Sequence, residues 1–486
     1  MAPLWHVGRA ASIPVALAAL VFAIGWSSLG ASFQFDDWNV IVGDPRVQSL
    51  AAWWQSMPGM RALLKASFAL NYELGGRVEV FRAFNLLVHA LNAALLFALL
   101  QRLGRATSQP QPAAAAALAA LIFALHPVQT EAVTYLSGRS VSLAATFSLL
   151  AMLLWQRRTK SLHPARWVAA STLMFALALA CKEIAVILPA ALLLLHAVTQ
   201  ESGGARKNMP TLTPWRHVMP HLTLVAVAAV LALTVLPYAW LLRATLEHRS
   251  IGANLLTQAN GVSYLIGQLM FFDRLNSDPM LPTVAGLNAA ALGRGTLLLA
   301  LLACGLTQLR RRPALAFGVL WFFVWLAPTN SLIPREDVAN DRQLYLALAG
   351  PAWLLSLGLI RIIRTLPPPA RPLVIALVAV SIATLLGSAT RERNRVYDSE
   401  IGFWRDVIAK TPRNVRALNN LGMAYAVACR RDEALATFAV AEQLAPTDYR
   451  ARVNAWRLRE RDLPGVPTTC ATPVAETTAQ TAENPR

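Results

Sequence analysis

The sequence contains little charge for its length. Only 14% of its 486 residues are Asp, Glu, Lys or Arg, against roughly 25% in ordinary soluble domains. Hydrophobic residues make up 56%, and the mean hydropathy is +0.45. A soluble protein of this composition could not cover its surface with polar groups, so most of the chain must lie in lipid. The composition therefore excludes a soluble enzyme, a disordered chain and a coiled coil.

Acidic residues and cysteine are also scarce. The chain has 26 Asp and Glu against 44 Lys and Arg, a formal charge of +18. No nucleic-acid motif accompanies this basic excess, so we expect no nucleic-acid partner. Of the four cysteines, Cys181 and Cys304 lie in apolar runs, and Cys429 and Cys470 lie near the C-terminus. This arrangement predicts neither a disulfide framework nor a metal site.

Long apolar runs predict about eleven membrane-spanning helices in an all-α bundle. Lys and Arg clusters follow alternate runs, and they fall on one side, the cytoplasm, if the chain crosses eleven times. The C-terminal segment is then outside. Residues 255–273 are also apolar, but as a span they would put Arg310–Arg312 outside, so we interpret them as an interfacial or re-entrant helix. The first run resembles a signal peptide, although its length favours an uncleaved span. The predicted spans are 11–31, 83–101, 113–127, 138–156, 166–181, 184–199, 218–242, 291–309, 314–329, 344–363 and 372–390.

The first outer loop, 32–82, begins with adjacent carboxylates. Asp36 and Asp37 stand just beyond the first span. A carboxylate pair can split its pKa values and leave one member ionised as a general base. The alternative is a solvated helix end in which Asp is only a turn residue. Further along, Trp53 and Trp54 predict a helix on the bilayer surface, where aromatic rings favour the interface.

Other outer loops place cations beside carboxylates. His126, Glu131 and Arg139 share one connection, and Lys182 and Glu183 share a tight turn between two apolar helices. Such charges can pair with each other and be purely structural. A tight turn at the membrane surface is also where a cation would meet a bound anion.

A later outer loop ends in Arg342, with Tyr345 one turn on. Arginine suits bidentate contact with phosphate, although a lone arginine here is equally explained as a membrane-surface anchor. Taken together, carboxylates and cations gather on one leaflet, whereas the cytoplasmic side shows only basic anchors. The asymmetry favours a site that takes an anionic lipid headgroup on the outer face.

From about residue 391 the apolar runs stop. Residues 413–446 fit the 34-residue tetratricopeptide pattern, in which Gly422 lets two helices approach closely. Because one repeat cannot bury its own face, we expect packing on 397–410 and a capping helix at 447–462, and we favour packing over peptide binding as its role. The Pro/Thr/Ala-rich end is predicted to be disordered. The predicted units are the membrane domain 1–390, the repeat segment 391–462 and the tail 463–486.

Several of these segments, in order, resemble one family. FQFDDWNVIVGDPRV, HPVQTEAVTYLSGRS, CKEIAVILP and APTNSLIPREDVANDRQLYLALAG are similar to loop motifs of the transmembrane and tetratricopeptide repeat-containing O-mannosyltransferases and their bacterial relatives. LTQANGVSYLIGQLMFFDRLNSDPMLP is similar to the family's long outer segment, which ends in an aspartate, here Asp278. The sequence departs from the usual Arg-Leu-Tyr run by inserting Gln343.

The family belongs to the C-superfamily (GT-C) glycosyltransferases, and the resemblance implies an inner-membrane enzyme with a periplasmic repeat. Such an enzyme transfers mannose or another hexose, with inversion, from a polyprenyl-phosphate carrier to a hydroxyl of a protein (Ser/Thr) or glycan acceptor. Asp36 or Asp37 would be the catalytic base, and Lys182, Arg139 and Arg342 would stabilise the leaving phosphate. The expected supporting residues are His126, Glu131, Glu183, Asp278 and Tyr345. These residues require no metal or other cofactor, although some GT-C enzymes use a divalent cation.

Two other functions are compatible with the sequence pattern. A non-catalytic membrane scaffold would present the repeat to a partner and would tolerate the loss of Asp36 and Asp37. A transporter for lipid-linked sugars would place charges near the bilayer midplane inside broken helices. Here the charges stand at helix ends on one side, which argues against the transporter.

Overall fold

The computed structural model describes residues 5–200, 214–235, 238–284, 286–460, 462–467 and 470. All regular secondary structure in these ranges is helical, so the predicted all-α class is confirmed. The chain divides into two compact units, Met1–Asp398 and Ser399–Arg486. The helices of the first unit are α1 (Trp5–Gly25), α2 (Leu50–Gln55), α3 (Ala62–Glu73), α4 (Val78–Ala106), α5 (Pro112–Leu125), α6 (Thr130–Val133), α7 (Arg139–Arg157), α8 (Pro164–Cys181), α9 (Leu188–Gln200), α10 (Pro214–Thr234), α11 (Tyr238–His248), α12 (Ile251–Gln268), α13 (Ala289–Thr307), α14 (Pro313–Leu326), α15 (Leu344–Ala347), α16 (Ala349–Ile363) and α17 (Arg371–Arg395).

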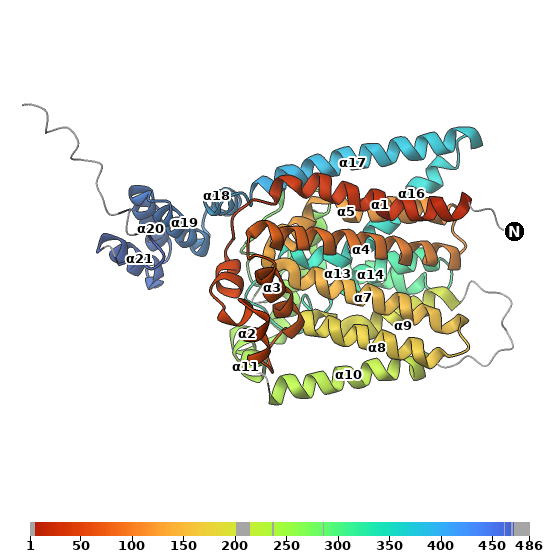
Figure 1. The fold of residues 1–486 in the computed structure, drawn as a ribbon, viewed down its shortest axis with the longest axis horizontal. Helices are drawn as coiled ribbons and strands as arrows, with labels where there is room; N and C mark the ends of the chain where they lie inside the picture. Colours follow the sequence, from red (N-terminus) through yellow and green to blue (C-terminus); the bar gives the residue numbers. More distant parts are fainter. Residues whose placement is uncertain are drawn as a thin grey trace, which may run out of the picture. The chain divides into compact units, whose positions relative to one another are not determined.

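The long helices of the first unit run side by side as a bundle (Figure 1). Its core is built on α5, whose run from Ala115 to Leu125 is buried except at Ala117. Glycine allows α14 and α16 to cross at backbone contact, because a Cβ on Gly350 would lie 2.2 Å from the carbonyl oxygen of Gly318. Small residues at such crossings are typical of helix packing in membranes.

Six helices in the described ranges are long and apolar enough to cross a membrane, and two bent pairs raise the number to as many as eight. The number indicates a multi-pass membrane protein. Each of the eleven predicted spans overlaps one of these helices, one bent pair or one of three shorter apolar helices, but the number of crossings remains a prediction. The six are Val78–Ala106, Leu136–Arg157, Pro164–Cys181, Trp215–Thr234, Ala289–Thr307 and Pro368–Arg395; the bent pairs are Pro112–Leu125 with Pro127–Val133 and Asp341–Ala347 with Ala349–Ile363; the shorter helices are Ser12–Ser28, Glu183–Thr199 and Pro313–Leu326.

The apolar stretch predicted to be interfacial forms α12, which is not among these candidate spans within the described ranges. Its position at the membrane surface remains a prediction. α2 and α3 are the helices of the first outer loop, and α2 carries Trp54, whose side chain is 70% exposed. At the same end of the bundle lies α11, whereas α1 and α17 both begin at the opposite end (Figure 1).

The second unit consists of α18 (Glu400–Lys410), α19 (Val415–Val427), α20 (Arg431–Leu444) and α21 (Tyr449–Arg459). α19 and α20 pack closely at Gly422, where a Cβ would lie 2.5 Å from the ring of Phe438. The sequence pattern predicted this close approach. The assignment of the pair to the tetratricopeptide class remains a prediction.

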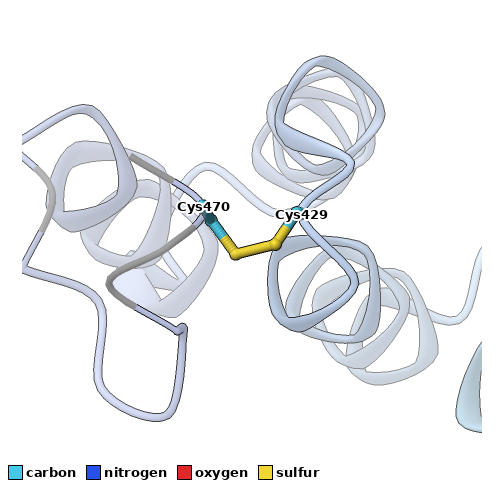
Figure 2. Close-up of a disulfide and its surroundings, with 2 residues drawn as sticks. All are labelled: Cys429 and Cys470. Carbon is cyan, nitrogen blue, oxygen red and sulfur yellow. A yellow bond between two sulfur atoms is a disulfide. The ribbon is translucent and has the colours of Figure 1, made fainter. Parts of the chain in front are cut away.

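A disulfide joins Cys429, just after α19, to Cys470 (Figure 2). The expectation that the cysteines form no disulfide is therefore wrong for this pair. The two positions are 41 residues apart in the sequence, too far for any local spacing signal, and the intervening helices bring them together. Most of the tail predicted to be disordered lies outside the described residues.

Candidate active site

The loop after α1 holds Asp37 inside the protein. Asp37 has no exposed surface. Its Oδ1 accepts hydrogen bonds from the backbone N–H of Ser137 (2.7 Å) and from the hydroxyl of the same residue (2.5 Å), and Oδ2 accepts one from the backbone N–H of Gln34 (3.0 Å). Burial raises the pKa of the Asp37 carboxyl to about 6, although these hydrogen bonds and the charge of Arg82 act to lower it. Asp37 therefore ties the first outer loop to the second.

Its neighbour, Asp36, is only half-buried. The backbone N–H of Asp36 donates to the hydroxyl of Tyr135 (3.1 Å), which also hydrogen-bonds with the Asp36 side chain. Phe35, directly before the pair, has a φ of 40°, a conformation that bulky residues rarely adopt and that concentrates at functional sites. Of the two carboxylates, Asp36 is the one that a second molecule can reach.

Two buried arginines hold the loops around the aspartates. Arg82 on α4 donates to the carbonyl oxygen of Ser32 in the first loop (2.6 Å) and to that of Thr134 in the second (3.3 Å). Arg139, at the start of α7, donates to Oδ1 of Asn85 (2.6 Å) and to backbone carbonyls of α3 and α4, and its guanidinium lies near three phenylalanine rings. The family resemblance implied that Arg139 binds the donor phosphate. Since Arg139 has no exposed surface, we do not include it among the proposed phosphate ligands.

The second outer loop also fixes Arg342. Oε2 of Glu131 accepts a hydrogen bond from the backbone N–H of Arg342 (2.9 Å), and Oε1 lies 3.7 Å from the Nε of the same arginine. The loop can fold back on itself because residue 138 is glycine: a Cβ on Gly138 would lie 2.1 Å from the carbonyl oxygen of Glu131. The guanidinium carbon of Arg342 is 5.9 Å from the ring centroid of Tyr135, and its charge interacts with that of Asp36. Arg342 thus belongs to the same site as the aspartates.

Lys182 and Arg342 lie in one cluster with two further arginines, Arg61 and Arg335. Burial and the charges of these three arginines lower the pKa of Lys182 well below its usual range. Arg61, at the start of α3, forms a two-pronged ion pair with Glu183, in which Nε lies 2.9 Å from Oε1 and Nη2 lies 3.0 Å from Oε2. Because the charges of three arginines act on Lys182, a bound anion would relieve the repulsion among these cations.

Three further predicted residues have other partners. His126 is buried, and its Nε2 lies 3.2 Å from the carbonyl oxygen of Leu269. The hydroxyl of Tyr345 lies 2.8 Å from Nδ1 of His89 in the interior of the bundle. Asp278 is 6% exposed, and its backbone N–H donates to the side chain two residues earlier (3.1 Å). These contacts account for His126 and Tyr345 as parts of the packed bundle.

The sequence analysis missed several residues of the site, among them Tyr135 and Arg82 as well as Ser137, Arg335 and Arg61. Ser137 and Arg335 stand inside quoted loop motifs, and their place there is the signal that could have found them. Arg61 stands in the first outer loop without any pattern around it. Over the ranges that the structure describes, no three His, Cys, Asp or Glu side chains lie close enough together to hold a metal ion.

The combined arrangement suits proton removal beside anion binding. A reachable carboxylate stands next to a buried one, and several cations that can hold an anion come from other loops. α2 and α3, which lie on either side of Arg61 in the sequence, are at one end of the bundle together with α11 (Figure 1).

Comparison with known proteins was informative, although no family model matches the chain. Protein O-mannosyl-transferase TMTC4 of Mus musculus is 26% identical over 475 residues, covering 81% of this chain and 61% of the relative. Protein O-mannosyl-transferase Tmtc2 of Drosophila melanogaster is 31% identical over 190 residues, 35% of this chain and 20% of the relative. TMTC4 of Homo sapiens is 31% identical over 186 residues, 32% of this chain and 25% of the relative.

The chain thus spans between 20% and 61% of the length of these relatives. The longest alignment covers most of this chain, and matches to several members of one group agree with each other. The resemblance seen in the loop motifs is confirmed: the chain is a relative of the TMTC protein O-mannosyl-transferases.

Proposed function

We propose that this protein is a GT-C glycosyltransferase that moves mannose or another hexose from a polyprenyl-phosphate carrier to a serine or threonine hydroxyl of a protein acceptor. The observation that carries the proposal is the meeting of a reachable carboxylate, Asp36, with Arg342 and its cluster of cations. These residues come from loops far apart in the chain. The names of the relatives support the class of reaction, and the membrane helices support a lipid-linked donor.

In the proposed reaction, Asp36 accepts the proton of the acceptor hydroxyl. The hydroxyl oxygen then forms a bond to the anomeric carbon from the face opposite the phosphate, and the bond between that carbon and the phosphate oxygen breaks with inversion. The electron pair leaves with the polyprenyl phosphate. Asp37 does not take part directly, because both of its oxygens are occupied by the N–H and O–H groups of Ser137 and Gln34; it holds Asp36 in place.

Lys182, Arg342, Arg61 and Arg335 would hold the donor phosphate. Negative charge grows on that group as the sugar departs, so fixed cations there lower the barrier more than they favour the bound donor. The carboxylate of Glu131 orients Arg342 by contacting both the backbone N–H and the side chain of the arginine. Glu183 orients Arg61.

The proposed topology puts this site and the second unit in the periplasm. The first support is the one-sided clustering of Lys and Arg. The second is independent: the Cys429–Cys470 disulfide is a bond that persists in oxidising compartments such as the periplasm and is rare in the cytosol. Reporter fusions at residues 312 and 450 should lie on opposite sides of the membrane. If both report the same side, the eleven-span topology is wrong.

The decisive experiment compares periplasmic proteins from cells carrying the wild type, Asp36→Asn or no copy of the protein, by mass spectrometry. We expect a hexose mass shift on Ser/Thr peptides in the wild type alone. Asp273→Asn is the matched control, because Asp273 is an exposed carboxylate in another outer loop. If Asp36→Asn cells show the full set of modified peptides, the enzyme proposal fails and the scaffold alternative takes its place.

A further inference from the structure

An apolar groove lies between α8 and α10, outside the candidate active site. A groove of about 650 Å³ runs between these helices, which is within the size range of small-molecule sites. Small side chains of α8, including Ala165, Ala169 and Ala176, form one wall, and Pro220 and Leu224 of α10 form part of the other. The groove is therefore apolar along most of its length.

Both helices are largely exposed on the surface of the bundle. Each passes the length and composition test for a membrane span, and only 28% of the apolar window of α8 and 11% of that of α10 are buried inside the protein. A ligand of this groove must therefore be compatible with the hydrocarbon region. A polar metabolite is excluded by the apolar walls.

The groove has one basic end. Arg216 and His217, at the start of α10, both line it. Neither α8 nor α10 contains an Asp or Glu, and within the described residues Nδ1 of His217 has no hydrogen-bond partner. This end therefore offers the positive charge of Arg216 beside an apolar channel.

The surroundings of this end are those of a membrane–water boundary. Arg158, whose charge acts on His217, packs on Trp155 inside the bundle, whereas the exposed Arg157 lies 5.0 Å from the ring centroid of the half-buried Trp167. Paired aromatic and basic side chains are typical of the headgroup level. The groove thus begins at the headgroup level and extends along the helices into the hydrocarbon region.

This end is also distant from the proposed donor site. Lys182 follows the last residue of α8, whereas Pro164, which lines the groove, is the first. At about 1.5 Å per residue, an 18-residue helix separates them by roughly 27 Å. The basic end of the groove therefore stands in the opposite leaflet from the donor phosphate.

We propose that this groove binds an anionic glycerophospholipid, with its phosphate at Arg216 and His217 and one acyl chain between α8 and α10. Charge complementarity at one end and apolar walls along the rest identify this occupant. The site is independent of the glycosyltransferase proposal, because none of its residues belongs to the Asp36 site.

The test uses the purified full-length protein and native mass spectrometry, with phosphatidylglycerol as the probe and phosphatidylcholine as the zwitterionic comparison. Arg216→Ala should weaken phosphatidylglycerol binding about five-fold, as expected for one basic residue near an anionic headgroup. Ala169→Trp should fill the channel and remove the tightest-bound lipid. The matched controls are Arg364→Ala, an exposed arginine after α16, and Ala303→Trp, an exposed alanine on α13; both should bind like the wild type.

Several outcomes would overturn the proposal. Equal loss in the controls would mean nonspecific lipid contact. Equal affinity for phosphatidylcholine would remove the role of the basic end. Preferential retention of polyprenyl phosphate would make the groove a second carrier site, and dimers that Ala169→Trp dissociates would make it an interface between two copies. None of these readouts depends on sugar transfer, so failure here leaves the proposed function untouched.

Discussion

Two groups of cations surround the carboxylate pair, and they differ in what their N–H groups meet. Arg82 and Arg139 are buried, and their hydrogen-bond partners include backbone carbonyls on neighbouring elements. Lys182 and Arg342 instead lie among other cations, with Glu131 and Glu183 as the nearby carboxylates. The first group braces the fold, whereas the second group has the unbalanced positive charge that the proposed phosphate site requires. The residue type alone does not distinguish these roles, because all four residues are basic. The roles are distinguished by the groups that each side chain contacts.

The largest expected effect concerns the aspartates themselves. Asp36→Asn should reduce sugar transfer by about 10²–10⁴-fold, because general-base catalysis contributes about that much, while the amount of folded protein stays unchanged. A transfer assay with a polyprenyl-phosphate sugar and an acceptor peptide gives the rate. If the Asp36→Asn variant transfers sugar at the wild-type rate, Asp36 is not the catalytic base.

The bracing role predicts a stability effect for Arg139→Met. The substitution keeps the length of the side chain but leaves Asn85 Oδ1 and two backbone carbonyls without their buried donor. Since each unsatisfied buried polar group costs about 1–3 kcal/mol, we expect a clear fall in melting temperature in detergent and in folded yield. If Arg139→Met folds like the wild type but loses donor binding, Arg139 belongs to the second group.

The anion-binding role predicts the reverse pattern for Lys182→Ala and Arg335→Ala. Removing one charge-assisted contact costs about 1.5–3 kcal/mol, or roughly a ten- to hundred-fold loss in kcat/KM for the donor, with little change in melting temperature. Arg364→Ala serves as the matched control. Unchanged donor kinetics in both variants would leave the cluster without a catalytic role.

The smallest expected effect is a pH dependence. The pKa of Asp37 is raised from 3.8 to about 6 in the folded protein, so the folded state holds the proton more tightly than the unfolded state. Stability relative to Asp37→Asn should therefore be greatest below the unfolded pKa and should decrease as the pH rises through about 6. Melting temperatures of the two proteins between pH 4 and pH 7 should show the decrease as a difference of a few degrees. A constant difference across this range would mean that Asp37 does not titrate there.

The sequence predicted which residues lie at the candidate site better than it predicted what each residue does there. Apolar runs predicted the long helices, and the loop motifs proposed Asp36, Asp37, Lys182 and Arg342, which the structure brings together at one site. The motifs could not separate Asp36 from Asp37, because the difference lies in Ser137, which is 100 residues away from Asp37 in the sequence. Adjacent residues in one motif can thus receive opposite environments from distant segments.

Arg61 and the disulfide also show that contacts between distant residues cannot be predicted from local sequence patterns. Arg61 belongs to the cation cluster only because α3 brings it to Glu183, 122 residues further along the chain. Cys429 and Cys470 meet only because α20 and α21 lie between them. No local spacing encodes either contact, since both arise from how helices pack.

The long separations in the site have a consequence for the order of its assembly in the membrane. During synthesis, Asp37 can form its hydrogen bonds to Ser137 only after Ser137 has been made. Glu131 can contact Arg342 only after the chain has grown by a further 211 residues. A nascent chain therefore carries Glu131 through most of membrane insertion before Arg342 is made. Under the proposed function, the site is complete only when the segment that carries Arg342 has been made, so a chain with incomplete insertion should be inactive.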